Sequence, residues 1–156
     1  MTVPSPGDSA PDFILRDQNR EEVALSSFRG RRNVLVVFYP FAFSAICTGE
    51  LSAVRDDLAT FQNDAVQVLA VSVDHPFVLR AWADAHGYRF PLLSDFWPHG
   101  EVATRYGVFN TGAGFALRGT FLVDHTGIVR FAEVNEVGEP RDQENWRRAV
   151  QALASV

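Results

Sequence analysis

Two continuous apolar runs dominate the pattern of hydrophobic and polar positions along the chain. The first is NVLVVFY at residues 33–39, and the second is VQVLAVSV at residues 66–73. Both are rich in β-branched residues and lack a polar alternation, which is typical of central strands buried on both faces. Two shorter runs, DFILRD at 12–17 and EEVAL at 21–25, predict further strands near the N-terminus.

Helical spacing follows each central run. After the first run, one helical face is predicted from the apolar residues Leu51, Val54, Leu58 and Phe61. After the second, a helix ending at Gly87 is predicted to carry on one side Val78, Ala81, Trp82 and Ala85. A last helix is predicted to have an apolar face formed by Trp146, Ala149, Val150 and Leu153.

The order of these elements predicts the fold class. Alternating strands and helices indicate right-handed crossovers and a parallel sheet core. Near the C-terminus, GTFLVD, the turn HTG and IVRFAEV at residues 119–134 predict an antiparallel hairpin. We therefore expect an α/β, thioredoxin-like fold with a central mixed sheet, flanking helices and an N-terminal strand extension, formed by one domain over residues 1–156.

Composition and charge narrow the classes of function. A chain of 156 residues with 47% hydrophobic residues can bury a sizeable core. The net charge of −5 and the lack of a basic block do not indicate a nucleic-acid or anionic-membrane partner. No apolar run is long enough for a membrane helix, and the N-terminus lacks the features of a signal peptide. A single cysteine fits a reducing compartment, so a soluble cytoplasmic protein is expected.

That cysteine, Cys47, follows the first central run and is predicted to lie in the first turn of a helix. Free backbone N–H groups and the helix dipole favour a thiolate there. Lowering the pKa of an ordinary thiol by three units requires roughly 4 kcal/mol. A helix terminus supplies about 0.3–1 kcal/mol, so a cation must contribute if the thiol is activated. Arg118 is the best candidate, because the loop before its strand would pack against the start of the cysteine helix; its alternative is a solvated surface position.

Several other cysteine chemistries do not fit the sequence. Without a second cysteine there is neither a C-x-x-C redox pair nor a zinc site built on thiolates, and no metal site is predicted. A phosphatase loop would need arginine at the position of Ala53. The histidines have no local context that suggests a partner for Cys47, and each is expected at the surface: His75, His86, His99 and His125.

Five residues together carry a family resemblance. Pro40, Ser44 and Cys47 form P-x-x-x-S-x-x-C, CTGE adds Glu50, and RGTF contains Arg118. This constellation resembles the active-site motif of the peroxiredoxins, and the similarity extends from APDF at residues 10–13 to GIVRFAE at residues 127–133. Within that family the chain most resembles the one-cysteine branch called alkyl hydroperoxide reductase E. The resemblance implies a thiol-dependent peroxidase without a cofactor that reduces hydrogen peroxide and organic hydroperoxides, with peroxynitrite as a further candidate.

The resemblance also implies roles for individual residues. Cys47 would attack a peroxide oxygen and become a sulfenic acid, while Arg118 would stabilise the thiolate and the leaving oxygen. Ser44 would hydrogen-bond the peroxide or cap the helix, and it stands where threonine is commoner in the family. Pro40 would wall the pocket or simply end the strand. Supporting roles are less defined: Glu50 would hold an arginine or complement the helix terminus, and Arg141 would join this network or be exposed.

The single cysteine determines the expected partners. With no resolving cysteine, the sulfenic acid needs an external thiol, and the resemblance implies mycothiol with a mycoredoxin-type partner, or a thioredoxin-type reductant. A homodimer or higher oligomer is expected, with its interface or else the core formed by Phe41, Phe43, Phe96, Trp97 and Phe109. The alternative function is a redox sensor or holdase-type interaction protein that uses Cys47 as a switch.

Overall fold

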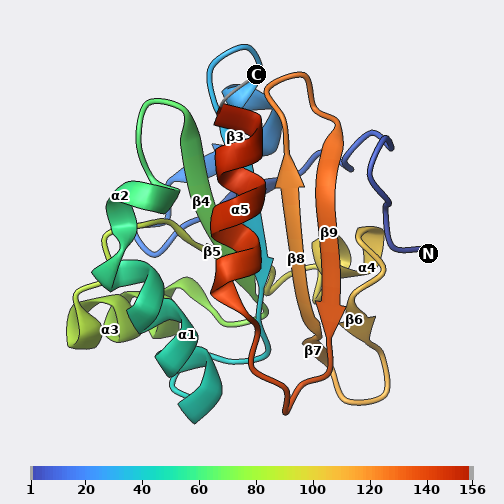
Figure 1. The fold of residues 1–156 in the computed structure, drawn as a ribbon. Helices are drawn as coiled ribbons and strands as arrows, with labels where there is room; N and C mark the ends of the chain where they lie inside the picture. Colours follow the sequence, from blue (N-terminus) through green and yellow to red (C-terminus); the bar gives the residue numbers. More distant parts are fainter. Residues whose placement is uncertain (1, 155–156) are drawn as a thin grey trace.

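The computed structural model describes residues 2–154 and is built around a seven-stranded mixed sheet of order β2-β1-β5-β4-β3-β8-β9 (Figure 1). In chain order, the strands of this sheet are β1 (Ile14–Arg16), β2 (Glu22–Ala24), β3 (Asn33–Phe38), β4 (Val66–Ser72), β5 (Leu92–Ser94), β8 (Arg118–Val123) and β9 (Val129–Asn135). A separate two-stranded ribbon consists of β6 (Phe109–Asn110) and β7 (Phe115–Ala116).

The helices are short and lie between or after the strands. They are the 3-10 helix η1 (Leu25–Phe28) and the α-helices α1 (Ala45–Asp56), α2 (Leu58–Phe61), α3 (Pro76–His86), α4 (Glu101–Arg105) and α5 (Gln143–Ala154). Within residues 2–154, none of these helices combines the length and the apolar character that crossing a membrane would need.

The two apolar runs form the centre of the sheet. Strands β3 and β4 pair in parallel from Asn33 opposite Val66 to Phe38 opposite Val71, and every residue of both strands is buried. Strand β5 continues the parallel pairing beyond β4, whereas β8 runs antiparallel to β3 and forms the expected hairpin with β9. This is the thioredoxin-like α/β architecture that the sequence pattern predicts, with β1 and β2 as the N-terminal extension.

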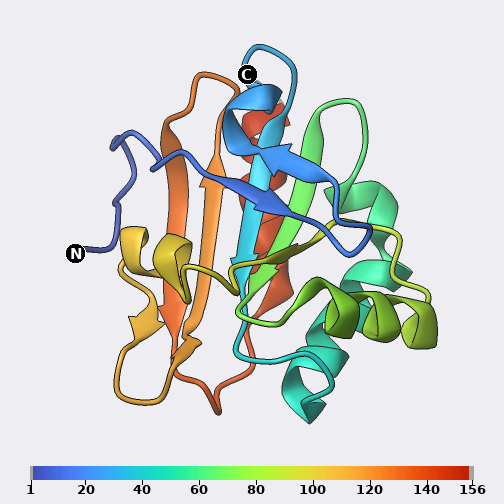
Figure 2. The same cartoon turned by 180° about the vertical axis from the view of Figure 1, so that it is seen from behind.

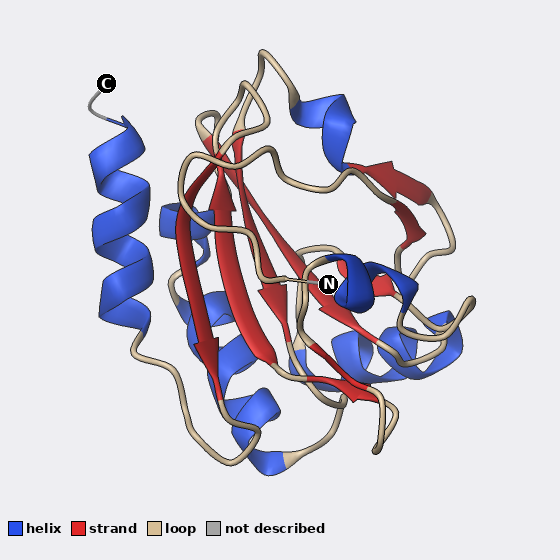
Figure 3. Ribbon diagram, turned by 90° about the vertical axis from the view of Figure 1, so that its right-hand side faces the viewer, coloured by secondary structure: helices blue, strands red, loops and turns tan. Residues whose placement is uncertain are grey.

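Alternate residues of β3 serve two hydrophobic clusters, one on each face of the sheet. Leu35 and Val37 pack with α1, α2, α3 and α5. Val34, Val36 and Phe38 pack with α4 and the N-terminal segment. Figure 3 shows α5 standing on one side of the sheet, and Figure 2 shows α4 and the N-terminal segment on the other. The period of two along the strand therefore produces the layered structure.

The helix predicted after β3 is interrupted. Helix α1 ends at Asp56, Asp57 adopts φ −125°, and α2 begins at Leu58. The Asp57 carboxylate accepts hydrogen bonds from Thr60 and from Arg147 of α5, which holds the break in place. The expected apolar residues still face the core on both sides of the break.

The predicted apolar side of α3 was wrong. Val78, Ala81 and Ala85 are exposed, and only Trp82 of that set is buried. The buried stripe consists instead of Pro76, Leu79, Trp82 and Ala83. Burying leucine removes more apolar area from water than burying an alanine, so the helix is rotated toward Leu79. Its end at Gly87 is as expected, because this residue adopts the left-handed conformation of a C-cap with φ 69°.

Gly119 allows β8 to approach the segment before β6 closely. A Cβ atom at this position would lie 2.8 Å from Cγ1 of Val108, closer than side chains tolerate. The close contact between β8 and Val108 therefore requires glycine at position 119, directly after Arg118.

Candidate active site

Cys47 lies in the first turn of α1, immediately beyond the carboxyl end of β3. The helix begins at Ala45 with Ser44 in the N-cap position, and the cysteine side chain is fully buried. Its sulfur therefore lies where the backbone N–H groups lack helical partners and the helix dipole is positive. Burial alone would fit a packing role, so the neighbouring charges decide the chemistry.

Arg118 is the cation next to this sulfur. Its Nη2 lies 3.4 Å from Sγ of Cys47, and its side chain is 2% exposed. The placement follows from strand register: Thr120 of β8 pairs with Val37 of β3, so the antiparallel continuation brings Arg118 to the end of β3. The guanidinium also donates from Nη1 to Glu50 Oε1 at 2.7 Å and from Nε to the Val137 carbonyl at 2.7 Å.

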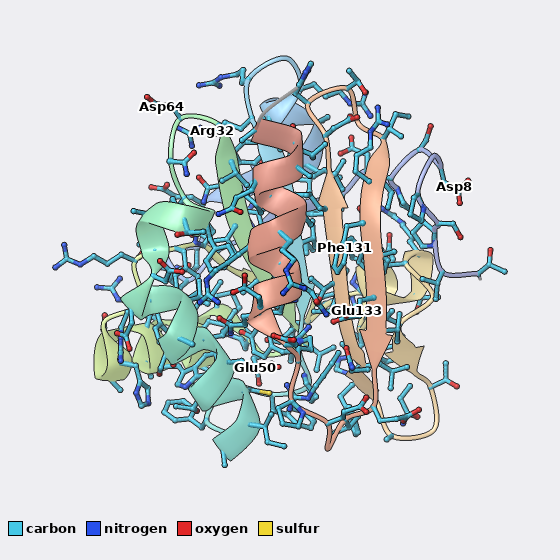
Figure 4. All side chains as sticks on the ribbon, viewed as in Figure 1. Asp8, Arg32, Glu50, Asp64, Phe131 and Glu133 are labelled. Atoms are coloured by element: carbon cyan, nitrogen blue, oxygen red, sulfur yellow. The ribbon has the colours of Figure 1, made fainter. Side chains whose placement is uncertain are left out.

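Glu50 joins Arg118 to a second buried arginine, Arg141. It lies one helical turn after Cys47, and Figure 4 shows it near the start of α5. Arg141 donates from Nη2 to Glu50 Oε1 at 2.7 Å and from its backbone N and Nε to Oε2. Burial acts to raise the pKa of Glu50, but the hydrogen bonds and charges of Arg141 and Arg118 outweigh it and hold that pKa below its ordinary value. The structure thus shows Glu50 holding two arginines rather than only complementing a helix terminus.

Arg141 also fastens the C-terminal connector to the sheet. Its Nη1 donates to the Phe38 and Gly119 carbonyls and to the Thr120 hydroxyl. Its guanidinium lies 5.4 Å from the centre of the Trp146 ring. The alternative of an exposed arginine at this position is therefore wrong.

The charges of this buried cluster do not cancel without the sulfur. Two arginines and one glutamate leave a balance of 2 − 1 = +1. A net charge buried in protein is unfavourable unless it is paired. A thiolate at Cys47 would supply the missing negative charge.

Ser44 and Pro40 line a pocket of about 330 Å³ together with Arg118. The Ser44 hydroxyl donates to the Phe41 carbonyl at 3.0 Å and makes no capping bond to the helix, although Ser44 occupies the N-cap position. Its oxygen lone pairs are thus not used for capping. Pro40 is buried and contributes no N–H donor to the pocket wall.

Most of the pocket wall was not predicted from the sequence. The remaining lining residues are largely apolar, and they are Phe41, Ala45, Ile46, Phe115, Val137 and Gly138. They come from the loop after β3, from α1, from β7 and from the connector between β9 and α5. Only the tertiary pairing brings these segments together, so no local signal in the sequence could have indicated them.

The histidines lie apart from this chemistry. In residues 2–154 none of them hydrogen-bonds Cys47; His75 accepts from the Phe77 N–H, and His99 contacts the Phe96 and Gly114 carbonyls. Within the same part of the chain, no group of three or more histidine, cysteine, aspartate or glutamate side chains is arranged to hold a metal ion.

Fold and site together define a class of protein. Residues 6–132 match the model of the AhpC/TSA family, and the chain belongs to that family: it is a peroxiredoxin, a thiol peroxidase that reduces peroxides. It is 55% identical over 149 residues to alkyl hydroperoxide reductase E of Mycobacterium tuberculosis, covering 96% of this chain and 97% of that protein.

More distant proteins agree with this assignment. A chloroplastic 2-Cys peroxiredoxin of Hordeum vulgare is 32% identical, covering 99% of this chain and 77% of that protein. The reduced crystal structure of Plasmodium vivax 2-Cys peroxiredoxin superimposes with a TM-score of 0.86 at 29% identity, covering 97% of this chain and 83% of that one.

Replacing Glu50 by glutamine should destabilise the protein by roughly 3–5 kcal/mol, because it leaves two buried guanidinium groups without their carboxylate. The folded-state pKa of Glu50 is lowered, so its contribution is present above the ordinary glutamate pKa and is lost as pH falls through the lowered value. The variant should therefore also lose part of the acid dependence of stability. Urea denaturation at several pH values measures both effects.

Glu144→Gln is the matched control, since this carboxylate makes only exposed ion pairs with Arg147 and Arg148. It should change the free energy of unfolding by less than about 1 kcal/mol. Equal effects of the two substitutions would contradict the role of Glu50 in the buried cluster.

Proposed function

We propose that Cys47 is the nucleophile of the peroxidase reaction and that Arg118, Ser44 and Pro40 form the site around the peroxide. The observation that carries this proposal is the 3.4 Å contact between Arg118 Nη2 and the buried Cys47 sulfur. Arg118 also lines the pocket that Ser44 and Pro40 line. The thiolate attacks one peroxide oxygen, the O–O bond breaks, and an S–OH group forms. The other oxygen leaves with the bonding electrons and takes up a proton, giving water or an alcohol.

Ionisation of Cys47 is only part of the acceleration. An ordinary cysteine is already a few per cent thiolate near neutral pH, so full ionisation raises the reactive fraction about tens-fold. A thiolate of lower basicity is also a weaker nucleophile. The remaining acceleration comes from donors directed at the transferring oxygens. These are the Arg118 guanidinium and the Ser44 hydroxyl, which must turn from the Phe41 carbonyl to donate to the peroxide.

The pocket suits organic hydroperoxides as well as hydrogen peroxide and peroxynitrite. Its volume of about 330 Å³ exceeds what the peroxide group fills, and most of its wall is apolar. Ile46, Phe115 and Val137 can contact an alkyl group while the peroxide oxygens reach Arg118. Burial of that alkyl group contributes about 0.8 kcal/mol per methylene.

Arg118→Leu should reduce peroxide about a hundredfold more slowly than wild type even where Cys47 is fully ionised in both proteins, because a preorganised donor is removed. Stopped-flow rates are compared with a separate thiolate titration followed by ultraviolet absorbance. Arg31→Leu serves as the control, since Arg31 is exposed in the turn before β3. Equal rates at full ionisation would show that Arg118 acts only on thiolate formation.

We further propose that an external thiol restores Cys47 in a reducing, cytoplasmic compartment. Cys47 is the only cysteine of the chain, so its sulfenic acid cannot form a disulfide within the chain. A small thiol such as mycothiol would condense with S–OH, releasing water and forming a mixed disulfide. A mycoredoxin-type or thioredoxin-type protein of low thiol pKa would then attack that disulfide.

Protein treated with one equivalent of peroxide and then with a small thiol should carry the thiol adduct on Cys47 in mass spectra, because no internal thiol competes. Without the thiol, excess peroxide should produce the sulfinic acid. Cys47→Ser provides the control and should gain neither mass. Covalent dimers alone, at low protein concentration, would contradict the external-thiol cycle.

The exposed aromatic side chains support assembly with a second copy of the chain. We define an apolar patch as the exposed side chains Ile14, Phe77, Phe96 and Trp97, three of which are aromatic. The His75 ring lies 4.8 Å from the Phe77 ring and 5.2 Å from the Phe96 ring, which connects the patch. Contiguous exposed apolar surface of this kind is typical of protein interfaces, so a homodimer or higher oligomer is proposed.

The other aromatic residues that the sequence predicts at an interface or in the core differ in exposure. Phe41 and Phe43 are also exposed, in the loop that precedes Cys47. Phe109 instead packs against His99 and the backbone of Gly100, so it belongs with the partly buried residues of the core.

Trp97→Glu should shift the protein toward the monomer in sedimentation velocity, because Trp97 is 81% exposed and a charge there would be buried on association. Val134→Glu, an exposed apolar position on β9, serves as the control and should leave the mass unchanged. A monomeric wild-type protein at micromolar concentration would contradict the proposal.

A further inference from the structure

The loop between β3 and α1 carries both Pro40 and Ser44, so its backbone path determines where they lie around a peroxide. Within this loop, Phe43 adopts a left-handed conformation with φ 69°. For a residue other than glycine this costs about 1–2 kcal/mol. Such a conformation persists only where the surrounding structure holds it. The loop therefore needs a stabilising contact with a residue outside it.

Asp74 makes that contact. Its Oδ2 accepts hydrogen bonds from the Ala42 N–H at 2.8 Å and from the Ser72 hydroxyl at 2.7 Å. Apart from the hydroxyl of Ser44, no other side chain in residues 2–154 hydrogen-bonds the backbone of residues 40–43. Ala42 is itself buried, so water is a poor substitute for the carboxylate.

Asp74 is in turn fixed to the sheet. Ser72, which donates to its carboxylate, is the last residue of β4. The Asp74 carbonyl accepts a hydrogen bond from the hydroxyl of Ser94, the last residue of β5, at 2.7 Å. Asp74 thus links the ends of the parallel strands β4 and β5 to the middle of the loop. A hydrogen bond to a charged acceptor is roughly twice as strong as one between neutral groups.

We propose that Asp74 is a positioning residue for peroxide reduction: through the Ala42 N–H it sets the places of Pro40 and Ser44 around the peroxide. This rests on the proposed function of those two residues. Asp74 makes no hydrogen bond with Cys47, Arg118 or any other member of the buried charge cluster. Its loss should therefore disturb the peroxide site while the sulfur keeps its own surroundings.

Two substitutions separate the hydrogen bond from the charge. Asp74→Ala and Asp74→Asn both remove the negative charge, but the asparagine amide oxygen can still accept from the Ala42 N–H. Asp74→Ala should lower the second-order rate constant for peroxide about tenfold or more, because small displacements of positioning groups are costly. Asp74→Asn should stay within about threefold of wild type, because the acceptor remains. Alkylation of Cys47 by iodoacetamide should stay within about twofold of wild type in both variants.

Asp84→Ala is the matched control, since this carboxylate pairs with Arg80 on the exposed surface of α3 and should leave both rates unchanged. Equal peroxide rates in Asp74→Ala and wild type would overturn the proposal. A parallel fall in alkylation would also overturn it, because Asp74 would then support the sulfur or the fold in general.

A further measurement does not depend on whether the variants fold. Hydrogen exchange of the Ala42 amide in wild-type protein should be slow, and exchange at the rate of an unprotected amide would overturn the proposal. Cys47→Ser tests the underlying function independently: peroxide consumption by this variant would refute the role of Cys47 without bearing on the Ala42 bond.

Discussion

The rest of the site depends on one carboxylate, that of Glu50, buried between two guanidinium groups. Taking three charges out of water is unfavourable unless their hydrogen bonds are well satisfied. At Glu50 this condition is met, because Nη1 of Arg118 and N, Nε and Nη2 of Arg141 all donate to its carboxylate.

 Glu50 thus accepts four hydrogen bonds in all, one from Arg118 and three from Arg141. Its charge is therefore well matched, and the surplus positive charge is left to face Cys47.

This cluster joins segments that are far apart in the chain. Glu50 comes from α1, Arg118 from the start of β8, and Arg141 from the connector before α5. The helix end, the strand register and the connector must all be in place before a cation can lie beside the sulfur. The same interactions that stabilise the fold at this edge of the sheet therefore also place a cation beside the Cys47 sulfur.

Much of this arrangement could be predicted from the sequence, because it follows from local patterns. The apolar runs predict β3 and β4, and the strand-to-helix transition predicts Cys47 in a first turn. The proximity of Arg118 to Cys47 was expected as well, and the structure shows it at 3.4 Å. The catalytic roles of these residues stay predictions until they are measured.

The remainder depends on tertiary contacts that no local pattern encodes. The rotation of α3 toward Leu79 reflects competition among faces of similar apolarity, and the break at Asp57 depends on its ion pair with Arg147. The bond from the Ala42 N–H to Asp74 joins residues 32 positions apart. The bonds that Glu50 accepts from Arg118 and Arg141 span 68 and 91 positions.

The hydrogen bond from Arg118 Nε to the Val137 carbonyl couples the connector between β9 and α5 to the position of the guanidinium. The N–H groups of a guanidinium lie in one rigid plane. The Arg118 guanidinium therefore links the Val137 carbonyl at one edge of this plane to the Cys47 sulfur at another. A surface connector normally accepts insertions and deletions freely. Here a change in its length would tilt that plane away from the sulfur, so residues 136–141 are constrained in length as strictly as a core strand is constrained in register.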